Sequence, residues 1–161
     1  MNKLFIPFLF IVSLLVTSCS NDDEPKSVNA DGIAGEWYLT NIRGWEYDED
    51  APKGKYEFNE TFNYNSQGIP VGNNIYDAHK VLFTLSEEDI DKGIVYLRLT
   101  SYEWNHYADR WQPEDSGVVK FDGKQFIDGT MKVTVTKLTE DTMVTYQKDS
   151  DGETYITYTR L

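Results

Sequence analysis

Residues that commonly carry acid, base or metal chemistry are few in this chain and poorly spaced for it. Its two histidines, His79 and His106, lie far apart in sequence, and neither belongs to a His-x-x-x-His metal spacing. Ser101 lies close to His106, but the chain lacks the Gly-x-Ser-x-Gly turn that presents a nucleophilic serine. We therefore expect no catalytic residues, and an unrecognised hydrolase is the enzymatic alternative.

Two acidic runs, Asp48–Asp50 and Asp149–Glu153, could offer oxygen ligands to Ca²⁺. The second run lacks both the third acid before its glycine and the distant glutamate of an EF-hand loop, so we interpret it as a hairpin turn. The first run is typical of a solvated loop. We expect no cofactor and no bound metal, Ca²⁺ included.

Aromatic side chains are the best candidates for binding. Tyr102, Trp104, Tyr107 and Trp111 lie close together in sequence, and Trp45 is a further tryptophan beside acidic residues. Exposed aromatic rings could stack on sugar rings or line the mouth of a cavity. The alternative is that they pack a long loop onto the body of the protein.

The N-terminus has the features of a secretory signal, Met1–Ser18. Lys3 precedes an apolar run, 4–16, which is shorter than the approximately 20 residues that a membrane-spanning helix needs. Val16-Thr17-Ser18-Cys19 resembles the lipobox of bacterial lipoproteins, which implies cleavage after Ser18 and a covalent lipid on Cys19. Several acyl chains anchor a protein stably in a membrane. The alternative is an ordinary signal with an incidental cysteine, although Cys19 is the only cysteine and cannot form an internal disulfide.

Residues 19–31 are polar and acidic, and we interpret them as a flexible tether before a domain at 32–161. The tether resembles the surface-export tethers of Bacteroidetes lipoproteins. This resemblance implies that the protein is anchored in the outer membrane and exposed at the cell surface; a plain linker is the alternative. The net charge of −12 argues against nucleic acid as a partner, because phosphate contacts need lysine and arginine.

Alternating apolar and polar residues indicate β-strands from Gly35 onward. Tyrosine, phenylalanine and tryptophan, which favour strands, make up 14% of the residues. Within 55–65, Glu60 falls among aromatic residues, so we expect a tight turn at Asn59-Glu60 in preference to one long strand. Ser86–Asp89 has the form of a capping box and predicts one helical turn. The other expected strands are 35–43, 80–85, 94–104, 118–121, 125–127, 131–138, 142–147 and 154–160, with loops at 45–52, 66–74 and 105–117.

The spacing of the turns predicts the fold class. Asp122-Gly123 and Asp128-Gly129 stand between alternating runs, which is a strong hairpin signal. We expect an all-β protein: a single up-and-down antiparallel β-barrel of about eight strands, a size that leaves room for packed side chains or one small ligand. The side chains expected to fill the interior are Trp37, Phe58, Phe62, Leu97 and Leu99.

Three segments resemble the lipocalin-like lipoproteins of Bacteroidetes. Gly35-Glu36-Trp37 matches the Gly-x-Trp that opens the first lipocalin strand, 137–143 matches the penultimate hairpin, and 155–160 matches the closing strand. The resemblance implies that Arg160 packs over the indole of Trp37, a cation–π contact of about 0.5–2 kcal/mol. Gly35, Trp37 and Arg160 are thus its structural signature.

Two hypotheses for the function follow. The first is a lipid-anchored, non-catalytic barrel that binds a small hydrophobic molecule or a glycan at its mouth. The second is a packed barrel that serves as an accessory subunit and binds an envelope protein. The cavity volume discriminates between them, because ligand pockets usually exceed about 300 Å³. The candidate ligand contacts are Trp45, Tyr102, Trp104, Tyr107 and Trp111.

Overall fold

The computed structural model describes residues 32–89 and 94–161. The predicted signal Met1–Ser18, the predicted lipid attachment at Cys19 and the predicted tether 19–31 lie outside the described residues. Among the described residues, no helix has the length and apolar character needed to cross a membrane. The elements are β1 (Gly35–Tyr47), the 3-10 turn η2 (Pro52–Gly54), β2 (Lys55–Thr61), β3 (Asn63–Tyr64), β4 (Pro70–Val71), β5 (His79–Asp89), β6 (Ile94–Asn105), β7 (Arg110–Phe121), β8 (Gln125–Asp128), β9 (Met131–Leu138), β10 (Thr142–Lys148) and β11 (Gly152–Thr159).

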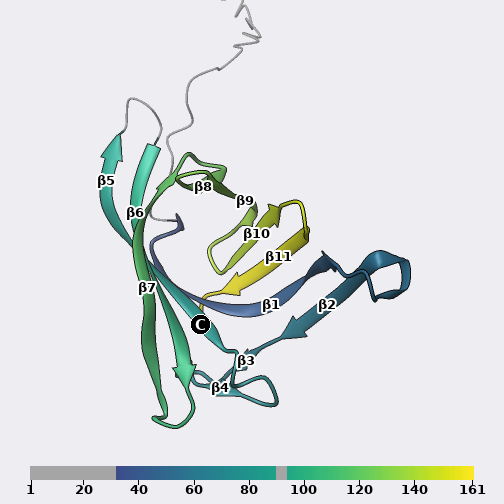
Figure 1. The fold of residues 1–161 in the computed structure, drawn as a ribbon. Helices are drawn as coiled ribbons and strands as arrows, with labels where there is room; N and C mark the ends of the chain where they lie inside the picture. Colours follow the sequence, from purple (N-terminus) through teal and green to yellow (C-terminus); the bar gives the residue numbers. More distant parts are fainter. Residues whose placement is uncertain (1–31, 90–93) are drawn as a thin grey trace, which may run out of the picture.

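The large sheet is antiparallel and closes into a ring, which confirms the predicted all-β barrel. Its strands follow the order β11-β10-β9-β8-β7-β6-β5-β1-β2, and β11 also pairs with β1 (Figure 1). The ring therefore contains β1 and β5 to β11, while β2 lies outside it. Closure pairs the edges that an open sheet would expose.

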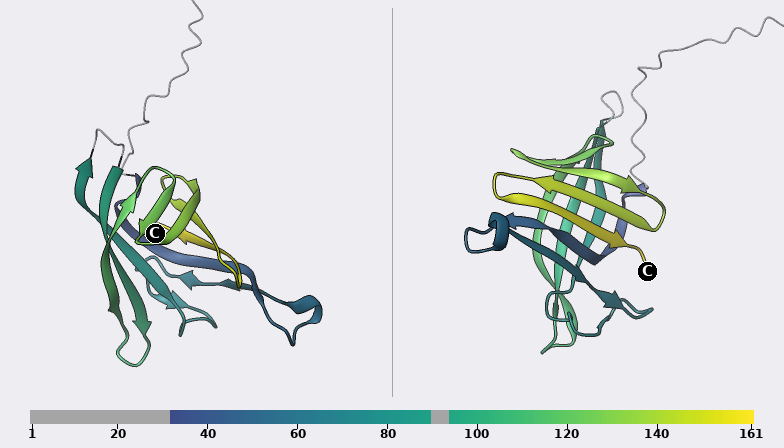
Figure 2. Two further views of the ribbon diagram at one scale, coloured as in Figure 1. Left: turned by 45° about the horizontal axis from the view of Figure 1, so that its top comes forward. Right: turned by 90° about the vertical axis from the view of Figure 1, so that its right-hand side faces the viewer.

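Strand β1 belongs to the barrel at one end and to a projecting hairpin at the other. Gly35–Tyr38 pair with β5, whereas Asn41–Tyr47 pair with β2. The opposite edge of β1 pairs with β11 and has an irregularity between Leu39 and Asn41. The β1–β2 hairpin consequently extends away from the barrel, as two further views show (Figure 2).

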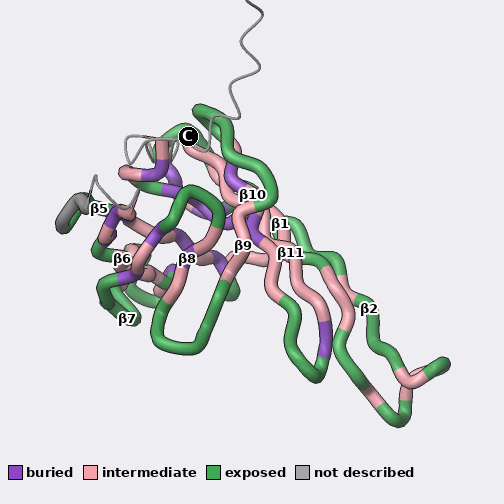
Figure 3. The backbone as a smooth tube through the Cα atoms, turned by 90° about the horizontal axis from the view of Figure 1, so that it is seen from above, coloured by how far each residue is buried: buried purple, intermediate pink, exposed green. Residues whose placement is uncertain are grey.

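The core lies inside the ring, with side chains from β1, β5, β6, β7, β8 and β10. Trp37, Leu97 and Met143 are fully buried. Viewed from above, buried positions gather within the barrel and the far end of the β1–β2 hairpin is largely exposed (Figure 3). The central cluster consists of Ile33, Trp37, Phe83, Val95, Leu97, Val119, Phe121, Phe126 and Met143.

The strands predicted after residue 117, and their hairpin turns, are confirmed. The turn expected at Asn59-Glu60 is wrong, because 55–61 form one strand in which Glu60 pairs with Ile42. Glu60 is exposed on the projecting hairpin, so its carboxylate needs no buried partner. The placement of Phe58 in the barrel interior is wrong for the same reason, since β2 lies outside the ring.

Three other boundaries also differ from those expected. The helical turn at Ser86–Asp89 is wrong: β5 continues to Asp89, with an irregularity between Leu85 and Glu87. The expected loops at 45–52 and 105–117 are shorter, because β1 extends to Tyr47 and β7 already begins at Arg110. These strands are longer than expected because they pair beyond the barrel core: β1 pairs with β2 as far as Tyr47, and β7 pairs with β6 from Arg110 onward.

Candidate functional site

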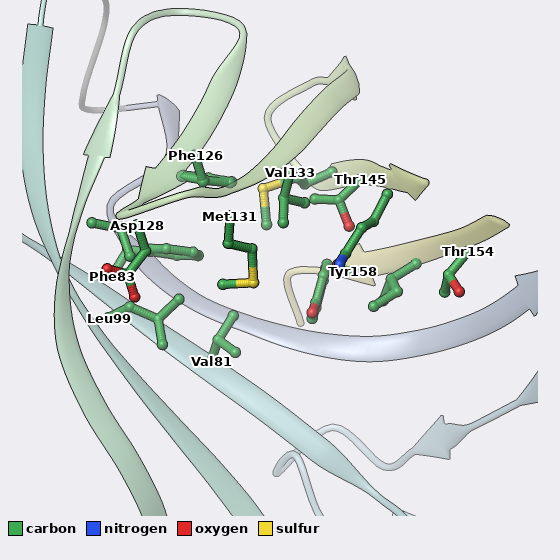
Figure 4. A pocket seen from close by; sticks show the side chains of 14 residues that line it. Val81, Phe83, Leu99, Phe126, Asp128, Met131, Val133, Thr145, Thr154 and Tyr158 are labelled. Atoms are coloured by element: carbon green, nitrogen blue, oxygen red, sulfur yellow. The ribbon is translucent and has the colours of Figure 1, made fainter. Parts of the chain in front are cut away.

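A pocket of about 160 Å³ lies inside the barrel. Period-2 alternation builds it, because every second side chain of β9, β10 and β11 points inward. Close by, these side chains converge from both walls of the barrel (Figure 4). The lining residues are Val81, Phe83, Leu99, Val119, Phe126, Asp128, Met131, Val133, Met143, Thr145, Gln147, Thr154, Ile156 and Tyr158.

Three of the polar lining residues mark one end of the pocket. Asp128 ends β8, Gln147 lies near the end of β10 and Thr154 near the start of β11, so the three stand at the same end of the barrel. Met131, at the start of β9, is 50% exposed there, whereas Met143 is fully buried. The pocket thus has a mouth with hydrogen-bonding groups and a mainly apolar interior, to which Thr145 and Tyr158 also contribute polar side chains.

Tyr158 brings a hydroxyl group into this apolar pocket. Its ring packs against the core cluster, and its hydroxyl has no hydrogen bond to another residue within the described ranges. Burial raises the pKa of Tyr158 to about 12, so the hydroxyl stays protonated at physiological pH. It can therefore donate a hydrogen bond to a ligand oxygen or nitrogen in the pocket.

Three of the predicted contact residues come together elsewhere, on the outer surface of the barrel. Tyr102, Trp104 and Trp111 gather with Tyr38 and Tyr64 around Lys80. We call these six residues the outer aromatic cluster. Lys80 faces outward because its neighbours on β5, Val81 and Phe83, belong to the core side.

The segment 62–78 covers the outer aromatic cluster. The Trp111 indole donates a hydrogen bond to the Gly68 carbonyl at 3.1 Å, and the Tyr64 hydroxyl donates to the Leu39 carbonyl at 2.7 Å. Trp104 is only 6% exposed, so the expectation of exposed stacking rings is wrong for this residue. The arrangement matches the alternative in which these aromatic residues pack a long loop onto the barrel.

Lys80 is an ammonium ion buried among rings. It lies 5.3 Å from the ring centroids of both Tyr102 and Trp111, and Nζ is 2.9 Å from Oε1 of Glu36. The hydrogen bond from Lys80 lowers the pKa of Glu36, and burial raises the pKa of Tyr38 to about 12. This ion pair satisfies a charge that would otherwise be costly to bury.

The other two predicted contact residues, Trp45 and Tyr107, are separate from both sites. Trp45 lies on the β1–β2 hairpin, with Nζ of Lys55 3.8 Å from its ring centroid. Tyr107 is 90% exposed in the turn between β6 and β7, beside His106. The five predicted contacts therefore do not form one site.

The polar candidates make no catalytic arrangement among the described residues. Oγ of Ser101 accepts a hydrogen bond from the backbone of Asp115, and His106 packs on Tyr76. Oδ1 of Asp149 accepts hydrogen bonds from the backbone N–H groups of Asp151 and Gly152, as in a hairpin turn. No three His, Cys, Asp or Glu side chains of residues 32–89 and 94–161 gather as a metal site would require.

The contact implied by the structural signature is present. The guanidinium carbon of Arg160 lies 4.2 Å from the ring centroid of Trp37, beside Gly35. Sequence reasoning missed the pocket residues of β10 and β11, although the alternation in 142–148 and 152–159 carried the signal. No known protein-family model matches the chain, and no curated protein matches it in sequence.

Proposed function

We propose that this chain is a lipid-anchored protein of the cell envelope whose barrel binds a small, mainly apolar molecule, or one end of an extended molecule, without catalysis. The anchor is inferred from the lipobox pattern that ends at Cys19. The related proposals, that the protein is lipocalin-like and is attached to the outer membrane, rest on the same sequence resemblances.

The observation that carries the binding proposal is the pocket itself. Its lining is apolar apart from the mouth, Thr145 and Tyr158, and sites that hold mainly apolar ligands in one orientation have a similar composition. The pocket opens at the end of the barrel marked by Asp128, Gln147 and Thr154. A ligand could therefore insert its apolar part and keep a polar group near the mouth.

The volume limits the size of the ligand. At about 160 Å³, the pocket is smaller than the approximately 300 Å³ of common ligand sites. It is comparable with an engineered apolar cavity of about 150 Å³ that binds benzene. We infer a ligand whose inserted part is about as large as a six-membered ring, or a short branched or chain end.

The second candidate function, binding of an envelope protein, is favoured by how much of the interior is filled. Trp37, Phe83, Phe121 and Phe126 occupy the space beside the pocket. A barrel with a packed interior has little room for a ligand, so it would bind a partner protein through its outer surface. The outer face of the barrel would then make the contacts with the envelope protein.

Cyclohexane and cyclohexanone test the binding proposal, because the two rings are alike in size and only the ketone accepts a hydrogen bond. We expect both to bind the protein at one saturable site. Tyr158→Phe should lower the affinity for cyclohexanone by about two- to twelve-fold, the equivalent of one neutral hydrogen bond. Its affinity for cyclohexane should equal that of the wild type. Isothermal titration calorimetry of the wild type and Tyr158→Phe measures this difference in affinity.

Leu99→Trp is the matched steric variant, because it fills the pocket without removing the hydroxyl group. Both ligands should then lose measurable binding while the protein keeps its β-sheet circular dichroism. Equal affinities of the wild type and Leu99→Trp would contradict binding in this pocket.

Cys19→Ala tests the anchor independently. The wild-type protein is expected in the membrane fraction with a mass increased by the lipid, and the variant without that added mass and released from the membrane. If the wild type and Cys19→Ala are both recovered free of the membrane, the anchor proposal fails, whatever the barrel binds.

A further inference from the structure

Strand β2 has a free edge. One of its edges pairs with β1, and no strand within the described ranges pairs with the other. The hairpin that carries it projects from the barrel, where another strand could approach (Figures 1 and 3). Exposed edges of this kind are templates for pairing with another chain.

The backbone groups available at this edge follow from the β1–β2 register. The Phe62 N–H donates to the Thr40 carbonyl, and the Asp48 N–H donates to the Gly54 carbonyl, at the two ends of the pairing. Hydrogen-bonded pairs alternate along antiparallel strands, so the even-numbered residues of β2 bond to β1. The N–H and C=O groups of Lys55, Glu57, Asn59 and Thr61 therefore point away from β1.

The surroundings of Thr61 support this assignment. Its carbonyl accepts a hydrogen bond from the Asn74 side chain at 3.2 Å, from the side opposite β1. The end of the edge is thereby occupied. Glu57 and Asn59 form the central part of the edge, with outward backbone groups for which the structure gives no partner among the described residues.

We propose that this edge pairs with the same edge of a second copy of the chain, with Phe58 on the two-fold axis. A two-fold axis perpendicular to the sheet makes such an antiparallel contact self-complementary. In this register Glu57 lies opposite Asn59 of the second copy, and each such pair exchanges two hydrogen bonds. No like charges face one another.

The side chains favour this register over the one that places Glu57 on the two-fold axis. With Glu57 on the axis instead, two glutamates would face one another, which is unfavourable. With Phe58 on the axis, the two phenylalanines form a non-hydrogen-bonded pair, in which side chains lie closest. Tyr56 stacks on Phe58 with centroids 6.4 Å apart and is half exposed, so a second copy would extend and cover an existing aromatic pair.

Cysteine cross-linking of the full-length chain in its membrane tests this pairing. Phe58→Cys places two thiols across the proposed axis, at a separation suited to a disulfide. Under a mild oxidant it should form covalent dimers faster than Tyr107→Cys, an exposed position in the β6–β7 turn. The unsubstituted chain controls for any reaction of Cys19.

Two substitutions of opposite charge at Asn59 test the register. Added to Phe58→Cys, Asn59→Lys should speed cross-linking by roughly two- to thirty-fold because the lysine faces Glu57 of the second copy, and Asn59→Glu should slow it similarly. Lysine cannot accept the hydrogen bond that the Asn41 amide donates to Oδ1 of Asn59, whereas a glutamate carboxylate still can, so the sign of the change in rate is the readout. In the neighbouring register residue 59 faces Lys55, so the two signs would reverse.

Reversed signs would overturn the proposed register. A Phe58→Cys rate no higher than that of Tyr107→Cys, or cross-linking to a different protein in its place, would overturn the second copy as the partner. Ligand binding inside the barrel does not depend on this edge, so its outcome is separate.

Discussion

At the residue scale, Arg160 joins the end of the chain to the start of the barrel. Nη2 donates hydrogen bonds to the carbonyls of Ala34 and Gly32, at 2.7 and 3.2 Å. The guanidinium lies over Trp37, whose indole N–H donates to the Ile33 carbonyl at 2.7 Å. One side chain therefore links the residue after β11 to the segment that leads into β1.

Arg160→Met should lower the free energy of unfolding by about 2–4 kcal/mol, because it removes a desolvated cation–π contact and two hydrogen bonds. Arg160→Lys keeps the charge but not the planar fork, so an intermediate loss is expected. Urea unfolding followed by tryptophan fluorescence measures both. A methionine variant as stable as the wild type would show that the contact contributes nothing.

The Lys80–Glu36 pair gives a second residue-scale prediction. Glu36→Gln leaves the buried ammonium without its counter-charge and should cost about 1–2 kcal/mol, since Glu36 itself is partly exposed. Lys80→Met removes the buried charge and should cost less. Thermal unfolding at neutral pH shows which of the two variants is less stable.

The pH dependence of the Glu36 effect has a defined sign. The pKa of Glu36 is lowered in the folded protein from 4.5, so its stabilisation is present above that value and is lost as the pH falls through the folded-state pKa. The difference in unfolding free energy between the wild type and Glu36→Gln should therefore shrink below pH 4.5. A difference that stays constant over this range would contradict the ion pair.

At the element scale, the segment 62–78 acts as a cover for the outer aromatic cluster. Gly68 lies so close to Tyr38 that an added Cβ would meet the Tyr38 hydroxyl at 2.5 Å. Its φ of +72° also favours glycine. The cover therefore depends on a residue without a side chain.

Gly68→Ala and Gly72→Ala form a matched pair for this prediction. Both glycines have positive φ, but a Cβ at Gly72 would meet no atom within 4 Å. Gly68→Ala should cost about 1–3 kcal/mol more, because overpacking adds to the backbone strain. Hydrogen exchange of the Trp111 indole N–H, which bonds to Gly68, reports loosening of the cover. Equal effects of the two variants would exclude close packing at Gly68.

The elements also show where sequence reasoning was sufficient. Asp-Gly turns between alternating runs placed the hairpins after β7 correctly, because backbone conformation at a turn is a local property. The Asn59-Glu60 turn was wrong because alternation cannot reveal that β2 leaves the barrel and has two solvated faces. The helical turn at Ser86–Asp89 was wrong because pairing with β6 outweighed a local capping preference.

At the scale of the whole molecule, closure of the ring was predictable from the number and spacing of strands, but the position of the pocket was not. The aromatic residues at 102–111 stand out in the sequence, yet they pack beneath 62–78. Met131, Met143 and Tyr158 are less conspicuous and line the pocket. Which strands lie side by side across the ring depends on long-range register, which a sequence pattern does not specify.

The methionines allow the most direct test of the pocket. The chain has three: Met1, in the predicted signal, and Met131 and Met143, which both line the pocket. In protein labelled at the methionine methyl carbons, titration with benzene should shift the signals of Met131 and Met143 together and saturably, with no effect in Leu99→Trp. Unchanged signals at saturating benzene, or shifts of the same size in Leu99→Trp, would contradict an internal ligand site.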